Sequence, residues 1–197
     1  MDGLIAATPF SKLSALVSAK CASPSAFYDA FNISEDMSEQ AYVVAMREWL
    51  SLGMFQYPAV LVANTFPGDV YFYHFDEGSP YEGKTFGIPY HGQCALFTYM
   101  NDIEAYPEEA KTIAEDMGRV WTEFAASGRS HDSDGEKPKA PWEEYKVARR
   151  FMRFGPKGLT QLSGWNDNDV RNYKWLPWVE AHYEELRALT VALTVRP

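Results

Sequence analysis

The chain has 197 residues, of which 46% are hydrophobic, 15% aromatic and 23% charged, a composition that excludes a disordered chain and predicts a globular unit with a full core. Its net charge of -9, from 18 Lys and Arg against 27 Asp and Glu, would repel a phosphate backbone and an anionic lipid surface, so we expect neither nucleic acid nor a membrane as a partner. Two cysteines exclude a disulfide framework.

The N-terminal segment predicts short helices. Residues 4–33 mix short apolar pieces with Pro9, Pro24 and several serines, which is typical of short helices joined by turns. Residues 13–26 are small and apolar, as in a signal peptide, but Asp2 stands where a positive region belongs, and no signal peptide is recognised. The expected location is cytoplasmic or unknown, and the localisation of a longer parent protein is left open.

Two longer helices follow. Asp36 and Glu39 resemble a capping box, and apolar residues then recur at helical spacing up to a predicted stop at Gly53. Pro58 fits the first turn of a second helix that runs to Phe66.

Residues 70–75 are almost continuously β-branched or aromatic, which predicts a strand buried on both faces. A helix that feeds such a strand indicates an α/β layer. Residues 76–93 hold four glycines and two prolines and predict a long connecting loop, and loops of this length in compact domains tend to be functional.

The C-terminal half predicts two helices and one strand. Residues 107–128 have a proline at the start, apolar residues at helical spacing and a closing glycine, and a last helix is expected over 177–193. A polar loop is expected over 129–140 and a short strand over 150–154. The cations of residues 146–153 are expected on a solvated face.

Four histidines are the candidates for acid-base chemistry, because the sequence has no G-x-S-x-G, no phosphate-binding glycine loop and no H-E-x-x-H. His74 lies in the predicted strand and favours a hydrogen-bonded core role, His131 lies in the polar loop and His182 on the last helix. Glycines and a proline surround His91, so its ring can be presented from a loop into a cleft.

The surroundings of His91 resemble a known family. The run V-Y-F-Y-H-F-D at 70–76, the glycine-rich stretch and Y-H-G-Q-C-A-L-F at 90–97 are similar to the type-B carboxylesterase/lipase family of α/β-hydrolases around its catalytic histidine. F-Q-Y-P-A at 55–59 resembles the helix start before that strand. W-T-E-F-A-A-S-G at 121–128 and P-W at 141–142 resemble the segments after it.

This resemblance implies an α/β fold class: the C-terminal portion of an α/β-hydrolase fold, with few strands flanked by helices and an incomplete sheet, in a single partial domain over residues 1–197. His91 then corresponds to the catalytic histidine, which takes the proton of a serine and returns it to the leaving alcohol. The serine itself lies upstream in the family. In the family, the acid is followed directly by glycine and an apolar residue. Asp2, followed by Gly3 and Leu4, fits this short pattern and is the candidate acid. No cofactor and no metal is implied.

The expected partners are small carboxylic esters in the intact relative, an N-terminal half, or a second copy bound through an exposed sheet edge. An apolar surface is expected around 70–75 and 54–66. The alternative is a non-catalytic truncated relative that acts as an interaction or binding module, or that has no function of its own. A third possibility, a hydrolase that depends on Cys94 with His91, rests on Cys94 alone, and a buried inert thiol is the simpler interpretation.

Overall fold

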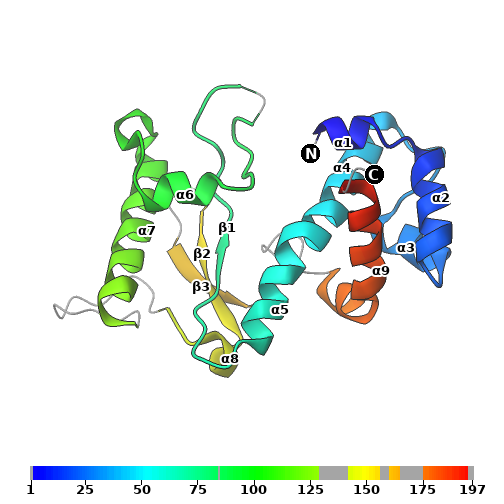
Figure 1. The fold of residues 1–197 in the computed structure, drawn as a ribbon. Coiled ribbons are helices and arrows are strands. Elements are labelled where there is room, and N and C mark those ends of the chain that lie inside the picture. Colours follow the sequence, from blue (N-terminus) through cyan, green and yellow to red (C-terminus); the bar gives the residue numbers. More distant parts are fainter. Residues whose placement is uncertain (1, 84, 129–141, 156–159, 165–174, 195–197) are drawn as a thin grey trace. The chain divides into compact units, whose positions relative to one another are not determined.

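The computed structural model describes residues 2–83, 85–128, 142–155, 160–164 and 175–194 (Figure 1). The described residues are mostly helical and include a three-stranded mixed sheet. They group into two compact units: residues 1–65 with 168–197, and residues 66–167. That the chain is one partial domain stays a prediction.

The first unit is helical. Its elements are α1 (Asp2–Ala6), α2 (Phe10–Lys20), α3 (Pro24–Phe31), α4 (Glu39–Ser51), the π-helical turn η1 (Leu52–Gln56), α5 (Tyr57–Thr65) and α9 (Leu176–Thr194). Short helices over residues 4–33 and a last helix are thus confirmed, with Pro9 as the N-cap of α2 and Pro24 as the first residue of α3. The fully buried side chains Leu13, Phe27 and Trp49 lie in its core, which α9 completes with Leu186 and Leu189.

The predicted stop at Gly53 is wrong, because the helix continues through η1 into α5. Pro58 has no backbone N–H, and its ring would crowd the carbonyl four residues earlier in a regular helix. A π-helical turn relieves this crowding: the N–H of Tyr57 bonds to the carbonyl of Leu52, five residues back. Gly53 instead provides room for α9, since a Cβ there would lie 2.7 Å from Oγ1 of Thr190. The start also differs from the expected capping box, because Ser38 is the N-cap and accepts the N–H of Ala41.

The second unit packs helices against a small sheet. Its elements are β1 (Tyr73–Phe75), α6 (Gln93–Thr98), the 3-10 turn η2 (Ile103–Ala105), α7 (Glu108–Ser127), α8 (Tyr145–Ala148), β2 (Arg150–Phe154) and β3 (Thr160–Gly164). The strand order is β1-β2-β3, with β1 parallel and β3 antiparallel to β2. The predicted strand over 150–154 is therefore confirmed.

The predicted strand over 70–75 is shorter than expected and only half-buried. Residues 70–72 bond largely to the segment before β2. Glu144 accepts the N–H of Val70, and the indole of Trp142 donates to the carbonyl of Phe72 over 2.8 Å. The same carbonyl also accepts the N–H of Met152 in β2 over 3.0 Å, so bonding to β2 starts at Phe72, and the regular strand begins at Tyr73.

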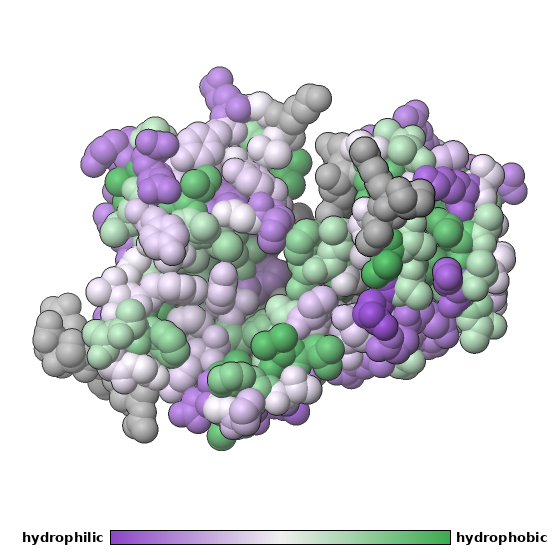
Figure 2. All heavy atoms as spheres, in the orientation of Figure 1, coloured by the Kyte–Doolittle hydropathy of each residue, from purple (hydrophilic) through white to green (hydrophobic). Residues whose placement is uncertain are grey.

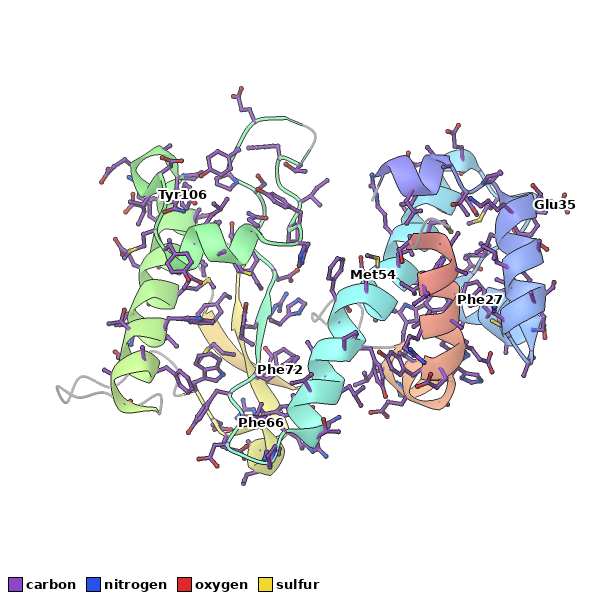
Figure 3. All side chains as sticks on the ribbon, viewed as in Figure 1. Phe27, Glu35, Met54, Phe66, Phe72 and Tyr106 are labelled. Atoms are coloured by element: carbon purple, nitrogen blue, oxygen red, sulfur yellow. The ribbon has the colours of Figure 1, made fainter. Side chains whose placement is uncertain are left out.

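The helix predicted over 107–128 is confirmed as α7. Pro107 is its N-cap, and Gly128 ends it with a φ of +67°. Ile113 and Met117 are fully buried against Met152 and Phe154 in the core of this unit. Tyr106, labelled in Figure 3, lies next to α6, where its ring is 4.9 Å from that of Phe97. The polar loop predicted over 129–140, with His131, lies outside the described residues.

We expect Gly155→Ala to destabilise the second unit by about 3 kcal/mol. Gly155 has a φ of +91°, and a Cβ there would lie 2.5 Å from the backbone nitrogen of Glu77, which moves only if the base of the 76–93 loop moves. Gly128→Ala is the matched control, because its φ is also positive but no atom of the described residues lies within 4 Å of a Cβ built there. It should cost about 1 kcal/mol in urea unfolding. Equal costs for the two variants would show that the close approach at Gly155 carries no stability.

Candidate functional site

His91 lies on the loop that follows β1, immediately before α6, as predicted. Its side chain is exposed. The next residue, Gly92, is the N-cap of α6 and has a φ of +87°, a left-handed conformation that glycine adopts without strain. Gly92 therefore lets the chain turn sharply into the helix and leaves the imidazole on the solvent side of the turn.

The loop that carries His91 is closed at its neck by backbone hydrogen bonds. The N–H of Gly87 donates to the carbonyl of Ser79 over 2.9 Å, and the N–H of Ser79 donates to the carbonyl of Ile88 over 3.3 Å. Gly78 packs directly against Gly87, since a Cβ on Gly78 would lie 2.8 Å from that residue's carbonyl carbon. The two arms of the loop are thus joined a few residues before His91.

A side-chain bond fixes the other side of His91. The amide oxygen of Gln93, a fully buried residue, accepts the backbone N–H of Tyr90 over 3.2 Å. This contact joins the residue before His91 to the first residue of α6, so the histidine is held between two anchored neighbours.

At the start of the loop the structure places a buried polar cluster that the sequence analysis does not predict. Nη2 of Arg153 donates to Oδ2 of Asp76 over 2.7 Å, and Nε2 of His74 lies 3.8 Å from Oδ1 of Asp76. The side chain of Arg153 is 4% exposed, that of Asp76 is 12% exposed and that of His74 is 13% exposed. His74 and Arg153 are register partners of β1 and β2, so the three side chains share one face of the sheet.

The expectation of a solvated face for the cations of residues 146–153 is therefore wrong for Arg153. Arg150 is exposed, as expected, but Arg153 lies in the central strand of the sheet and is covered. An arginine in that position needs an anionic partner, because an unpaired buried charge is costly. Asp76, the last residue of the motif at 70–76, is this anionic partner. The feature of the sequence that pointed to Asp76 was its position directly after a predicted strand.

Asp76 is held in its ionised form. Burial alone would raise the pKa of its carboxyl, but the interactions with His74 and Arg153 outweigh that effect and hold the pKa below its usual range. The carboxylate is therefore a permanent charge near neutral pH, and it binds the guanidinium as a structural anion.

Cys94 does not form the pair with His91 that the third possibility requires. Its described polar contacts are with Tyr73, whose hydroxyl donates to Sγ over 3.5 Å, and, through its carbonyl, with Thr98. Burial, followed by this contact with the thiol, raises the pKa of Tyr73, which therefore stays a neutral donor. These contacts fit a packing role for Cys94 and give no support to a cysteine nucleophile.

Two other candidate residues, His182 and Asp2, belong to the first unit. His182 stacks on Trp178 in α9, with ring centroids 4.5 Å apart, and its Nδ1 lies 2.9 Å from the carbonyl of Trp178, which fits a structural role. Asp2 is the first residue of α1 and belongs to the first unit, whereas His91 belongs to the second. A role for Asp2 as the acid partner of His91 stays a prediction.

In the described part of the chain, His91 belongs to no metal-binding group and lines neither of two surface hollows. Among the described residues, no group of three or more His, Cys, Asp or Glu side chains could hold a metal ion. Two surface hollows of about 450 and 320 Å³ lie in the first unit, lined around Tyr42 and around Tyr183, and His91 lines neither of them. None of the described helices is both long enough and apolar enough to cross a bilayer.

No protein-family model and no curated protein matches this chain. The resemblance to type-B carboxylesterases therefore rests on the motifs around His91 alone.

We expect Asp76→Asn to destabilise the second unit by about 3 kcal/mol at pH 7, because it removes the charge that the buried Arg153 faces. The folded-state pKa of Asp76 lies below the unfolded value of about 3.9, so its contribution is complete above that value and is lost as the pH falls through the folded-state pKa. The difference in the free energy of unfolding between wild type and variant should thus shrink below about pH 4.

Urea unfolding between pH 7 and pH 3 measures this difference. Glu184→Gln is the control, since Glu184 pairs with Arg187 in an exposed ion pair whose loss should cost less than about 0.5 kcal/mol. A cost for Asp76→Asn that matches this control, or that does not change with pH, would contradict a stabilising buried pair.

Proposed function

We propose that the chain is a C-terminal part of a type-B carboxylesterase-like hydrolase and carries the histidine half of an ester-hydrolysis site. The observation that carries the proposal is the presentation of His91: an exposed imidazole on an anchored loop between a parallel strand and a helix. In sheets with parallel strands, ligands bind beyond the carboxyl ends of the strands, and the loop after β1 leaves such an end.

His91 would act as a general base and then as a general acid. Its neutral ring takes the proton of a serine hydroxyl as the oxygen attacks the ester carbonyl, and the imidazolium then gives that proton to the leaving alcohol. Both steps need a ring that a nucleophile from outside the loop can reach, and an exposed side chain meets that requirement. The serine and the oxyanion donors must come from another segment, because the sequence has no nucleophile elbow.

Complementation tests this role. The chain alone should not hydrolyse short-chain aryl esters, and addition of the upstream portion of a type-B carboxylesterase, fused or in trans, should produce hydrolysis. His91→Ala should then lower kcat about a thousandfold or more, as loss of a catalytic-triad member does. His182→Ala should leave kcat within about twofold, because His182 stacks on Trp178 and its Nδ1 lies 2.9 Å from the Trp178 carbonyl, contacts that fit a structural role.

Asp2→Asn in the same complemented enzyme tests whether Asp2 is the acid. If Asp2 orients the imidazole of His91, this variant should also lower kcat strongly. Full activity of His91→Ala in a folded, complemented enzyme would overturn the proposal. Hydrolysis by the chain alone that a serine-directed inhibitor abolishes would do so as well.

The alternative function, an interaction module, is favoured by the outer edge of β1. In a parallel ladder, His74 uses its N–H and C=O toward β2, while Tyr73 and Phe75 direct theirs to the other side. Among the described residues no strand pairs with that side. Large apolar side chains are also exposed, among them Val62 on α5 and Phe86 on the loop, and Figure 2 shows hydrophobic residues interspersed on the drawn surface. Such an edge is a template for another strand.

If this edge binds a second copy, sedimentation should show concentration-dependent association despite the charge of -9. Tyr73→Pro should abolish it, because proline removes the outward N–H without removing a ladder bond. Tyr73→Ala is the matched control: it removes the same side chain but keeps the N–H, so association should persist. A compact monomer at all concentrations, or equal association of the two variants, would contradict pairing through this edge.

A further inference from the structure

The closed neck of the loop lies between Asp76 and His91 along the chain. Asp76 ends the motif after β1, and three residues later Ser79 exchanges backbone hydrogen bonds with Gly87 and Ile88. His91 follows Ile88 by three residues. Asp76 and His91 thus flank the neck, each three residues from one of its hydrogen-bonded residues.

Asp76 is fixed by two bonds to β2. Its backbone N–H donates to the carbonyl of Phe154 over 2.8 Å, and its carboxylate accepts from Arg153 over 2.7 Å. Close packing confirms the rigidity of this base, since the backbone of Glu77 lies against Gly155 so tightly that no Cβ would fit there. Every one of these contacts joins the loop to the strand β2 or to the residue directly after it.

We propose that Asp76 and Arg153 are positioning residues for His91: their buried ion pair fixes the base of the loop, and the Ser79–Gly87 closure transmits that position to the histidine. The proposal rests on the proposed function for its catalytic consequence, but not for the coupling itself. Neither residue touches the reacting atoms. Their effect on the reaction is to limit the positions that the imidazole samples, because a base displaced by about 1 Å from its nucleophile loses much of its rate.

A prediction about local stability follows from this coupling. With the ion pair removed, the neck of the loop should open more often than the sheet does, because the neck is held by two backbone bonds whereas β2 is bonded on both sides. The amide protons of Ser79 and Gly87 report that opening directly, since each donates across the neck.

Amide hydrogen exchange of the whole chain, measured by NMR at pH 7, tests the coupling without any activity. Asp76→Asn should speed the exchange of the Ser79 and Gly87 amides about tenfold, while the β2 amides that bond to β3 should remain slower to exchange than these two. Arg153→Lys, which keeps the charge but loses the planar guanidinium, should speed them by a smaller factor. If Asp76→Asn unfolds the unit, the β2 amides will exchange as fast as the loop amides. The exchange of the Ser79 and Gly87 amides in Arg153→Lys then tests the coupling.

Glu144→Gln is the matched control within the same unit. Glu144 accepts backbone N–H groups from Val70 and from the start of α8, so it holds the segment before β1 and not the loop after it. Its loss should leave the Ser79 and Gly87 amides unchanged. Unchanged exchange in both Asp76→Asn and Arg153→Lys, or equal acceleration in Glu144→Gln, would overturn the proposal.

The complemented enzyme gives the catalytic readout. Asp76→Asn should lower kcat about tenfold with KM unchanged, while Glu144→Gln keeps kcat within about twofold. A loop that loosens without any change in kcat would overturn the positioning role. If no complemented enzyme shows activity that depends on His91, the proposed function fails, and the exchange result still decides whether the ion pair controls the loop.

Discussion

The buried ion pair of Asp76 and Arg153 is the interaction on which the second unit depends. β1 has three residues in its ladder with β2, too few to hold an edge strand by backbone bonds alone. The ion pair adds a side-chain connection at the same place, and it is obligatory for a physical reason: Arg153 is covered in the central strand, and removing its charge from water is tolerable only with an anion in contact. The strand, its partner and the base of the loop are therefore specified together.

The parts of the fold that the sequence predicts are those that local patterns determine. α7 and α9 have apolar residues at helical spacing, and the ends of α7 carry a proline and a glycine whose preferences act over a few residues. The continuation of α4 into α5 was not predictable from the same rules, because Pro58 usually marks a helix start and only the packing of α9 against Gly53 favours a continuous path. The length of β1 was missed because its extended neighbours bond to residues about seventy positions later.

The candidate site divides in the same way. The glycines around His91 predict an exposed ring on a loop, since they act on the backbone where they stand. The polar cluster was not predictable, because Arg153 lies 77 residues from Asp76 and the alternation of charges in its strand is equally typical of a solvated face. What distinguishes the two interpretations is that β2 lies between two other strands, and strand order is not readable from the residues of β2.

The first unit is assembled from two distant parts of the chain, with residues 66–167 inserted between them. During synthesis, α1 to α5 leave the ribosome long before α9, yet α9 supplies the buried Leu186 and Leu189 of their core and fills the space above Gly53. The inserted unit is contiguous in sequence, and the core of its described residues uses none from α9. A nascent chain that ends before residue 176 lacks Trp178, which packs on Phe27 and Phe31 of α3, so these rings would lose part of their cover and become accessible to chaperones and proteases.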